Sequence, residues 1–223
     1  MVELIYCGGG NARFAKIAID AGFLYGSQLP ETVYFPLYFA DQNWRRPNRA
    51  AYMAALAKHT PHMASVLDLE RESQLPEVLG WAEDAAQYVR VVMLIPKMPG
   101  VIGGLPRQIG GATVRLGYSV PTKHGGTNVP PWEFSGWPVH LLGGSPPAQV
   151  RSAHYMNVVS ADGNMAEKMA TTRCAFFDPQ KKTTRGYFPS LTEYDGYVWG
   201  NDAPYEAWRR SCENIMRFWA QYR

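Results

Sequence analysis

The sequence predicts an α/β fold: a compact (βα)8 TIM-like barrel with reduced helices and a C-terminal helix, forming one domain over residues 1–223. Three observations support this prediction. Short apolar runs recur along the chain, and they are continuously apolar rather than alternating, which is typical of parallel strands covered on both faces. Segments with helical periodicity separate them. An open doubly wound parallel sheet is the alternative.

The expected elements follow one another in regular alternation. Strands are expected at Leu4–Cys7, Val33–Ala40, Ala64–Leu67, Val89–Ile95, Thr113–Val120, Val139–Leu142 and Asn157–Ser160, with an eighth at Cys174–Phe177. Helices are expected at Ala12–Ala21, Arg49–Lys58, Leu75–Gln87, Ala148–His154, Met165–Thr172 and Tyr205–Tyr222. Asn48 is expected to cap the second helix, and Pro76 to lie in the first turn of the third. Met98–Ala112 and Pro121–Pro138 are rich in Pro and Gly and are expected to be loops with short helical turns.

Composition and charge indicate which partners, cofactors and cellular location to expect. A formal charge of +3 is compatible with a polyanionic partner but does not identify one. Cys7, Cys174 and Cys212 have no CxxC spacing and no histidine cluster nearby, so neither a zinc site nor a disulfide framework is expected. No metal or other cofactor, no membrane partner and a reducing, cytoplasmic location are expected.

Polar residues stand where the apolar runs stop. Asp41 follows Val33–Ala40, Asp68 follows Ala64–Leu67, and Asp162 follows Asn157–Ser160 after one alanine. The carboxyl ends of barrel strands meet at one rim, so these acids are expected to face one pocket. Gln42, Lys97, Tyr118, Ser119, Gly143, Gly144 and Asn164 complete the expected site. The alternative for each acid is a helix N-cap or a loop residue.

Two carboxylates suit double displacement at a sugar carbon. One can attack the anomeric carbon while the other handles the proton of the leaving group. Burial or like charge can raise the pKa of one acid so that it serves as the proton donor.

Other residues are interpreted as structural. Gly8-Gly9-Gly10 lacks the spacing of a phosphate loop and is expected to form a tight turn. His124, His140 and His154 lack metal-ligand spacing. Aromatic residues in the loops could either stack on unpaired bases or seal one end of the barrel. They are Trp132, Trp137, Tyr187, Tyr194, Tyr197 and Trp199, and the basic residues Lys181, Lys182 and Arg185 lie near some of them in the sequence.

The strand-end segments resemble the tRNA-guanine transglycosylase superfamily, and more closely its short phage-type DNA 7-deazaguanine transglycosylases, over roughly Leu4 to Thr172. Phe39-Ala40-Asp41-Gln42-Asn43-Trp44 stands where the family has a Ser-Asp-Ser-Gly-Gly-type motif. Met63-Ala64-Ser65-Val66-Leu67-Asp68-Leu69-Glu70 is similar to its Met-Ala-Phe-Asp-Glu segment. Leu116–Val120 and Val139–Pro146 resemble its Gly-Leu-Ala-Val-Gly and Tyr-Leu-Met-Gly-Val-Gly-Thr-Pro segments, and an aspartate ends the seventh strand in both.

The resemblance implies a guanine/7-deazaguanine exchange. It makes Asp162 the nucleophile on C1′, Asp41 the general acid/base and Asp68 the reader of the base, with nucleic acid and a 7-deazaguanine base as partners. Pro96-Lys97 replaces the family's glutamine after the fourth strand. The Cys-x-Cys-x-x-Cys zinc segment, which helps to seat tRNA in the tRNA enzymes, is missing, and its absence favours DNA over tRNA. A phage-encoded member would act in the host cytoplasm.

The sequence is also compatible with two other functions and with a dimer. A metal-free N-glycoside hydrolase would form the same intermediate and resolve it with water. A non-catalytic nucleic-acid-binding barrel would bind DNA without needing Asp41 or Asp162. Exposed aromatics are compatible with a homodimer.

Overall fold

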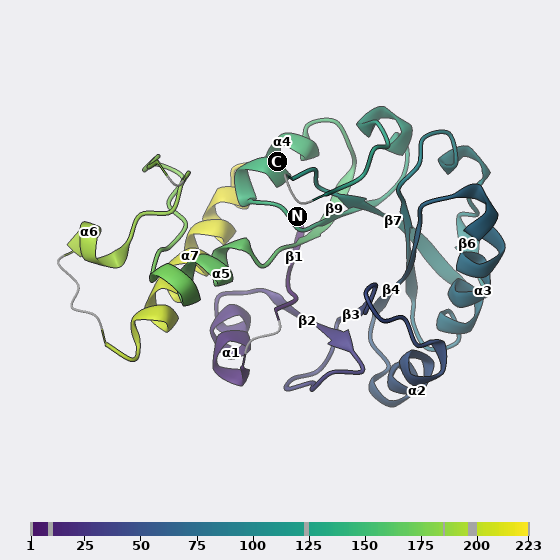
Figure 1. The fold of residues 1–223 in the computed structure, drawn as a ribbon, viewed down its shortest axis with the longest axis horizontal. Helices are drawn as coiled ribbons and strands as arrows, with labels where there is room; N and C mark the ends of the chain where they lie inside the picture. The colour runs from purple at the N-terminus through teal and green to yellow at the C-terminus, as the bar shows by residue number, and fades with distance from the viewer. Residues whose placement is uncertain (1, 9–10, 123–124, 185, 196–199, 223) are drawn as a thin grey trace.

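Eight parallel strands close into a barrel in the computed structural model, which describes residues 2–8, 11–122, 125–184, 186–195 and 200–222 (Figure 1). The strand order is β5-β4-β3-β2-β1-β9-β8-β7, and pairing of β5 with β7 closes the ring. The barrel strands are β1 (Glu3–Tyr6), β2 (Leu24–Leu29), β3 (Phe39–Gln42), β4 (Met63–Leu69), β5 (Val91–Pro96), β7 (Ala112–Ser119), β8 (Val139–Leu142) and β9 (Val158–Asp162). The short β6 (Gln108–Ile109) pairs antiparallel with β7 outside the ring. The (βα)8 prediction is confirmed.

Helices cover the outside of the barrel unevenly. They are α1 (Ala12–Asp20), α2 (Arg49–His59), α3 (Leu75–Ala85), α4 (Pro146–Ala153), α5 (Met165–Arg173), α6 (Leu191–Asp195) and α7 (Ala203–Ala220). Single 3-10 turns occur at η1 (Glu72–Gln74), η2 (Ile102–Gly104) and η3 (Pro131–Phe134), so the two loops rich in Pro and Gly carry short turns as expected. The C-terminal α7 contacts α1 and α5, on the side of the barrel away from α2 and α3 (Figure 1).

Two apolar cores result from the alternation of side chains along each strand. The smaller core fills the barrel interior with Ile5, Phe39, Met63, Val91, Met93 and Ile95. The larger core lies between the strands and the helices. Continuously apolar strands are explained by this arrangement, because both faces of the sheet are buried.

The second barrel strand differs from the prediction. It is β2, Leu24–Leu29, whereas most of Val33–Ala40 is a loop and only its last two residues begin β3. Pro36 lacks the N–H that a central strand needs, and the Phe35 ring packs edge-on against Tyr25. The β2 segment was not predicted as a strand, and it contains Gly26, a residue type that is unfavourable inside strands. A side chain at Gly26 would meet Ile5, Cys7 and Phe39 at 3.1–3.2 Å inside the barrel.

The eighth strand expected at Cys174–Phe177 is also wrong. This segment forms one isolated bridge, between Ala175 and Ser190, and lies outside the barrel. Its apolar residues are buried against α7, where Ser211 Oγ accepts a hydrogen bond from the N–H of Phe177. The barrel still has eight strands, because β2 forms where no strand was expected.

The helix starts follow their sequence signals. The Asn48 side chain accepts a hydrogen bond from the N–H of Ala51 at the start of α2, and Pro76 lies in the first turn of α3, as expected. Asn11 caps α1 by accepting from Arg13 and Phe14. In the part of the chain that the structure describes, no helix is long and apolar enough to cross a membrane.

Trp208 fastens α7 to the barrel, and its removal tests this contact. The ring is buried beside Tyr6, Phe14 and Phe23, and its indole N–H donates to the carbonyl of Phe14 at 2.9 Å. We expect Trp208→Ala to lower the free energy of unfolding by about 3–5 kcal/mol, measured by urea denaturation followed by circular dichroism. Trp132→Ala, at a side chain that is 74% exposed, is the matched control and should change stability by less than about 0.5 kcal/mol. Equal effects of the two substitutions would contradict this role of Trp208.

Candidate active site at the carboxyl ends of the strands

A cavity of about 730 Å³ opens at the carboxyl ends of the barrel strands. The acids Asp41, Asp68 and Asp162 all line it, on β3, β4 and β9. The other expected site residues that line it are Gln42, Lys97, Ser119, Gly143, Gly144 and Asn164. The strand ends therefore converge on one pocket, as the sequence predicted. Neither Asp41 nor Asp162 is a helix N-cap, because both lie within strands.

Asp41 is held by a serine from the next strand. Ser65 Oγ donates to Asp41 Oδ1 at 2.8 Å and accepts from the N–H of Gln42 at 2.8 Å. Burial, and then the negative charge of Asp162, raise the pKa of Asp41 to about 7, although the Ser65 hydrogen bond opposes the shift. Asp41 can therefore give and take a proton near neutral pH.

Asp162 is positioned by the turn that follows β8. The N–H of Gly143 donates to Asp162 Oδ1 at 3.0 Å. Gly143 and Gly144 have φ of 67° and 82°, a conformation that favours glycine, and this turn aims the N–H at the carboxylate. Gln149 Nε2 ties the turn to β9 by donating to the carbonyl oxygens of Gly143 and Asp162.

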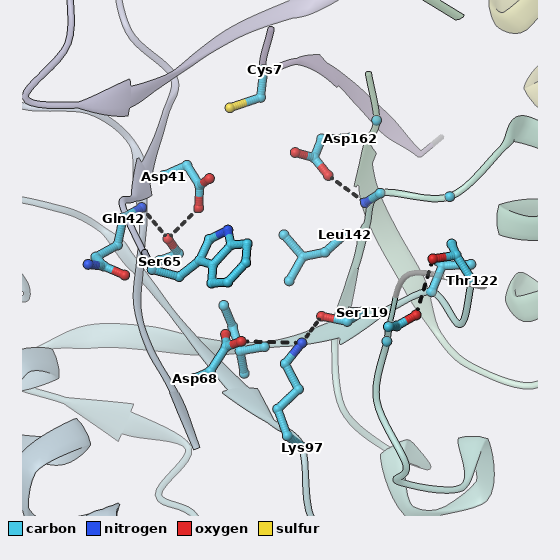
Figure 2. Close-up of a pocket in the computed structure, with 18 of the residues that line it drawn as sticks. Cys7, Asp41, Gln42, Ser65, Asp68, Lys97, Ser119, Thr122, Leu142 and Asp162 are labelled. Atoms are coloured by element: carbon cyan, nitrogen blue, oxygen red, sulfur yellow. Dashed lines mark hydrogen bonds and ion pairs between the residues drawn. The ribbon is translucent and has the colours of Figure 1, made fainter. Parts of the chain in front are cut away.

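The two acids differ in their surroundings although they share one cavity. Figure 2 shows Asp41 and Asp162 on opposite sides of the cavity, with the Cys7 thiol beside both. Burial, followed by the charges of Asp41 and Asp162, raises the pKa of Cys7, so the thiol stays protonated. Cys7 therefore adds no further negative charge between them.

A lysine and a third acid form the other wall. Lys97 Nζ lies 3.3 Å from Asp68 Oδ2 and donates to Ser119 Oγ (Figure 2). Burial raises the pKa of Asp68, and the Lys97 charge opposes that rise. This wall offers a cation, a carboxyl group and a hydroxyl to the edge of a polar ligand.

One expected site residue does not line the cavity. Tyr118 faces the helix layer, where its ring packs edge-on against Phe134 with 5.2 Å between centroids. Successive side chains of β7 point to opposite faces, so Ser119 faces the cavity and Tyr118 cannot. Sequence position at a strand end did not reveal this alternation.

Three residues near the acids were missed by the sequence interpretation. Ser65 and Cys7 line the cavity, and His140, which was taken as structural, lies below it with Nε2 3.6 Å from Asp162 Oδ1. Period-two alternation provides a signal for each: Cys7 lies two residues after the interior Ile5, Ser65 two after Met63, and His140 two before the pocket residue Leu142.

The aromatic residues expected in the loops have different environments. Trp137 is buried, with the Arg107 guanidinium 3.5 Å from its ring centroid, so it belongs to the core. Trp132 is exposed and Tyr187 is half-buried. Gly9, Gly10, His124, Arg185, Tyr197, Trp199 and the side chain of Tyr194 lie outside the described residues.

The arrangement can perform acid/base and nucleophilic chemistry. One carboxyl titrates near neutral pH, and a second is oriented by a backbone N–H on the other side of the same space. Among the described residues, no group of three or more His, Cys, Asp or Glu side chains could hold a metal ion.

The fold and the site define an α/β barrel protein with a carboxylate-lined pocket at the carboxyl ends of its strands. The chain belongs to a family of unknown function (DUF6610), whose model matches residues 18–220. A search of curated proteins found no match.

The raised pKa of Asp41 makes stability depend on pH. A carboxyl whose pKa is higher in the folded than in the unfolded state binds more protons when folded, so stability falls as pH rises from about 4 to about 7. Asp41→Asn keeps an oxygen that can accept from Ser65 and removes the buried charge. We expect it to be more stable than wild type by roughly 2–4 kcal/mol at pH 8 and by much less at pH 4, measured by urea denaturation.

Asp20→Asn, on the exposed face of α1, is the matched control for loss of a carboxylate. A stability difference between Asp41→Asn and wild type that is the same at pH 4 and pH 8 would contradict the raised pKa of Asp41.

Proposed function

We propose that this protein is a transglycosylase that exchanges guanine in nucleic acid, with DNA favoured over tRNA, for a 7-deazaguanine base. The observation that carries the proposal is the pairing of Asp41 and Asp162 in one cavity with unequal environments. Double displacement at a sugar carbon needs one acid that transfers protons and one that attacks. The order of these acids along the chain, and the family resemblance of their segments, agree with this division.

The first half-reaction breaks the bond between C1′ and the base. An Asp162 oxygen attacks C1′, the bond electrons leave with guanine, and protonated Asp41 supplies the proton that neutralises the departing base. The product is an ester between Asp162 and the sugar. A pKa of about 7 leaves a large fraction of Asp41 protonated at neutral pH.

The second half-reaction reverses these roles. Asp41, now ionised, removes the proton from the incoming 7-deazaguanine, whose nitrogen attacks C1′ and releases Asp162. Two displacements at one carbon retain its configuration, and Asp41 ends in its starting protonation state. Asp68, Lys97 and Ser119 form a polar wall that can hydrogen-bond the edge of the base in both steps.

A second cavity supports a nucleic-acid partner. It has a volume of about 1130 Å³ and shares Thr122, Gly144 and Asn164 with the first. Lys168 and Arg173 of α5 line it, are exposed, and form no ion pair with any residue that the structure describes. Glu193 also lines it, so the cations are concentrated on the α5 side. A nucleotide in the first cavity carries flanking phosphates, and each of these two side chains can neutralise one of them.

Loss of either acid tests the mechanism. Guanine-containing DNA or tRNA is incubated with a radiolabelled 7-deazaguanine base, and incorporated label is measured. We expect incorporation by the wild type and a loss of at least about 10³-fold in Asp162→Ala, because no ester can form. Asp41→Asn should slow both half-reactions and reduce the incorporated label, because an amide can neither supply the proton to the departing guanine nor take the proton of the incoming base.

Asp84→Asn, at an exposed ion pair between α2 and α3, is the control and should exchange normally. Absence of label on both nucleic acids with the wild type, or undiminished exchange by Asp162→Ala, would refute the assignment. Release of guanine without any added base would instead identify an N-glycoside hydrolase.

Removal of the α5 cations tests the nucleic-acid surface. We expect Lys168→Ala/Arg173→Ala to weaken binding of a fluorescently labelled single-stranded oligonucleotide. The slope of log affinity against log salt should fall by roughly 1–1.5, because two phosphate contacts are lost. Fluorescence anisotropy measures both quantities. Lys58→Ala/Arg90→Ala, which removes two exposed cations near the amino-terminal ends of the strands, is the charge-matched control. Equal losses in both double variants would exclude a site on α5.

A further inference from the structure

A row of polar side chains crosses the barrel interior below the pocket. Arg115, His140, Ser160 and Glu3 come from β7, β8, β9 and β1, which are consecutive strands in the sheet. The rest of the interior core is mainly apolar. The fully buried His140 and Ser160 need hydrogen-bond partners, and the row supplies them for Ser160 Oγ and for His140 Nδ1.

Each member contacts the next at hydrogen-bonding or ion-pair distance. Arg115 Nη1 lies 3.1 Å from Glu3 Oε2 and donates to Ser160 Oγ at 2.8 Å. Ser160 Oγ lies 2.6 Å from His140 Nδ1. The row ends under Asp162, because His140 Nε2 lies 3.6 Å from Asp162 Oδ1.

The His140 ring has one nitrogen without a hydrogen bond. The residue is completely buried, and Nε2 is a buried atom with no hydrogen-bond partner among the described residues. The nearby acceptor is Asp162 Oδ1, slightly beyond hydrogen-bond length. Hydrogen bonds of this kind can shorten when a substrate closes the site.

The donors and acceptors of the row determine where the imidazole proton lies. Arginine only donates, so Ser160 Oγ accepts from Arg115. A proton on His140 Nδ1 would make Ser160 accept a second time, and its own hydroxyl hydrogen would have no acceptor in the described interior. An imidazolium would have the same defect, because its Nδ1–H would again make Ser160 accept twice. Ser160 O–H therefore donates to Nδ1, and the neutral ring carries its proton on Nε2, facing Asp162.

The contacts also distinguish the two oxygens of Asp162. The N–H of Gly143 and the His140 ring both approach Oδ1. Figure 2 shows the other oxygen turned into the cavity, on the side of Asp41. Oδ1 thus accepts the N–H of Gly143 and has the His140 ring nearby, whereas Oδ2 accepts no hydrogen bond from any residue that the structure describes.

We propose that Glu3, Arg115, Ser160 and His140 form a positioning network that holds His140 as the Nε2–H tautomer and thereby selects Oδ2 of Asp162 as the attacking atom. The selection of the attacking oxygen rests on the proposed function; the tautomer does not. His140 is a positioning residue, because it acts through Asp162 and does not line the cavity. A network of this kind fixes the orientation of a reactive group before substrate arrives.

The tautomer can be measured without any substrate. Two-bond nitrogen–proton NMR spectra of protein labelled with ¹⁵N-histidine distinguish the two neutral tautomers and the imidazolium. We expect the wild-type His140 ring to be neutral and protonated on Nε2 at pH 7–8, and Ser160→Ala to shift it toward a mixture of tautomers. The signal is assigned by its loss in His140→Gln or, if that variant does not fold, by elimination using single substitutions of the other histidines. A wild-type ring protonated on Nδ1, or on both nitrogens, would overturn the proposal.

The effect on Asp162 is measured by kinetics. We expect Ser160→Ala to lower kcat for base exchange by about 10–100-fold while KM changes less than about twofold, because binding groups are untouched. Ser160→Thr, which keeps the hydroxyl, should recover most of the rate, and Ser152→Ala, at a hydroxyl bonded within α4, is the matched control. A changed tautomer with an unchanged kcat would overturn the positioning role. A wild type that exchanges no base would refute the proposed function, and the NMR measurement would still decide the network.

Discussion

Closure of the barrel by the pairing of β5 with β7 is the constraint on which the rest of the structure depends. It makes the sheet continuous, so the carboxyl ends of eight parallel strands form one ring. Acids that lie far apart in the sequence, Asp41 on β3 and Asp162 on β9, then share one cavity. An open sheet with the same strands would leave them at separate points along an edge.

Carboxyl groups that lie close together repel one another when ionised, and in this pocket each acid has its own partner that offsets the repulsion. Asp41 remains near its point of titration because burial and Asp162 act against the Ser65 hydrogen bond. Asp68 has Lys97 as its counter-ion, and Asp162 receives the N–H of Gly143. Each acid therefore has a different partner, and different partners allow one chemical class of side chain to serve in different roles.

The sequence predicted the fold class, and most of the residues that it singled out line the candidate pocket, because both predictions depend on local pattern. Strand length, apolar runs and helix signals such as Asn48 are readable within a few residues, and a residue just after a strand is placed at the rim by the fold itself. The two errors in the strand assignment have one source, which is packing against residues that are distant in the sequence. Gly26 looks out of place in a strand until Ile5 and Phe39 are seen to pack against it, and Cys174–Phe177 looks like a strand although α7 provides its burial.

The sequence by itself determined that parallel strands would bring Asp41, Asp68, Lys97 and Asp162 to one end of the molecule. Only the tertiary structure decided which side chains face the cavity, excluding Tyr118 and admitting Cys7 and Ser65. It also decided that His140 lies beneath Asp162 with Ser160 and Arg115 behind it. The physical reason is that these contacts join neighbouring strands across the barrel interior. Their geometry depends on the register between strands, and register cannot be inferred from the residue types within one short segment.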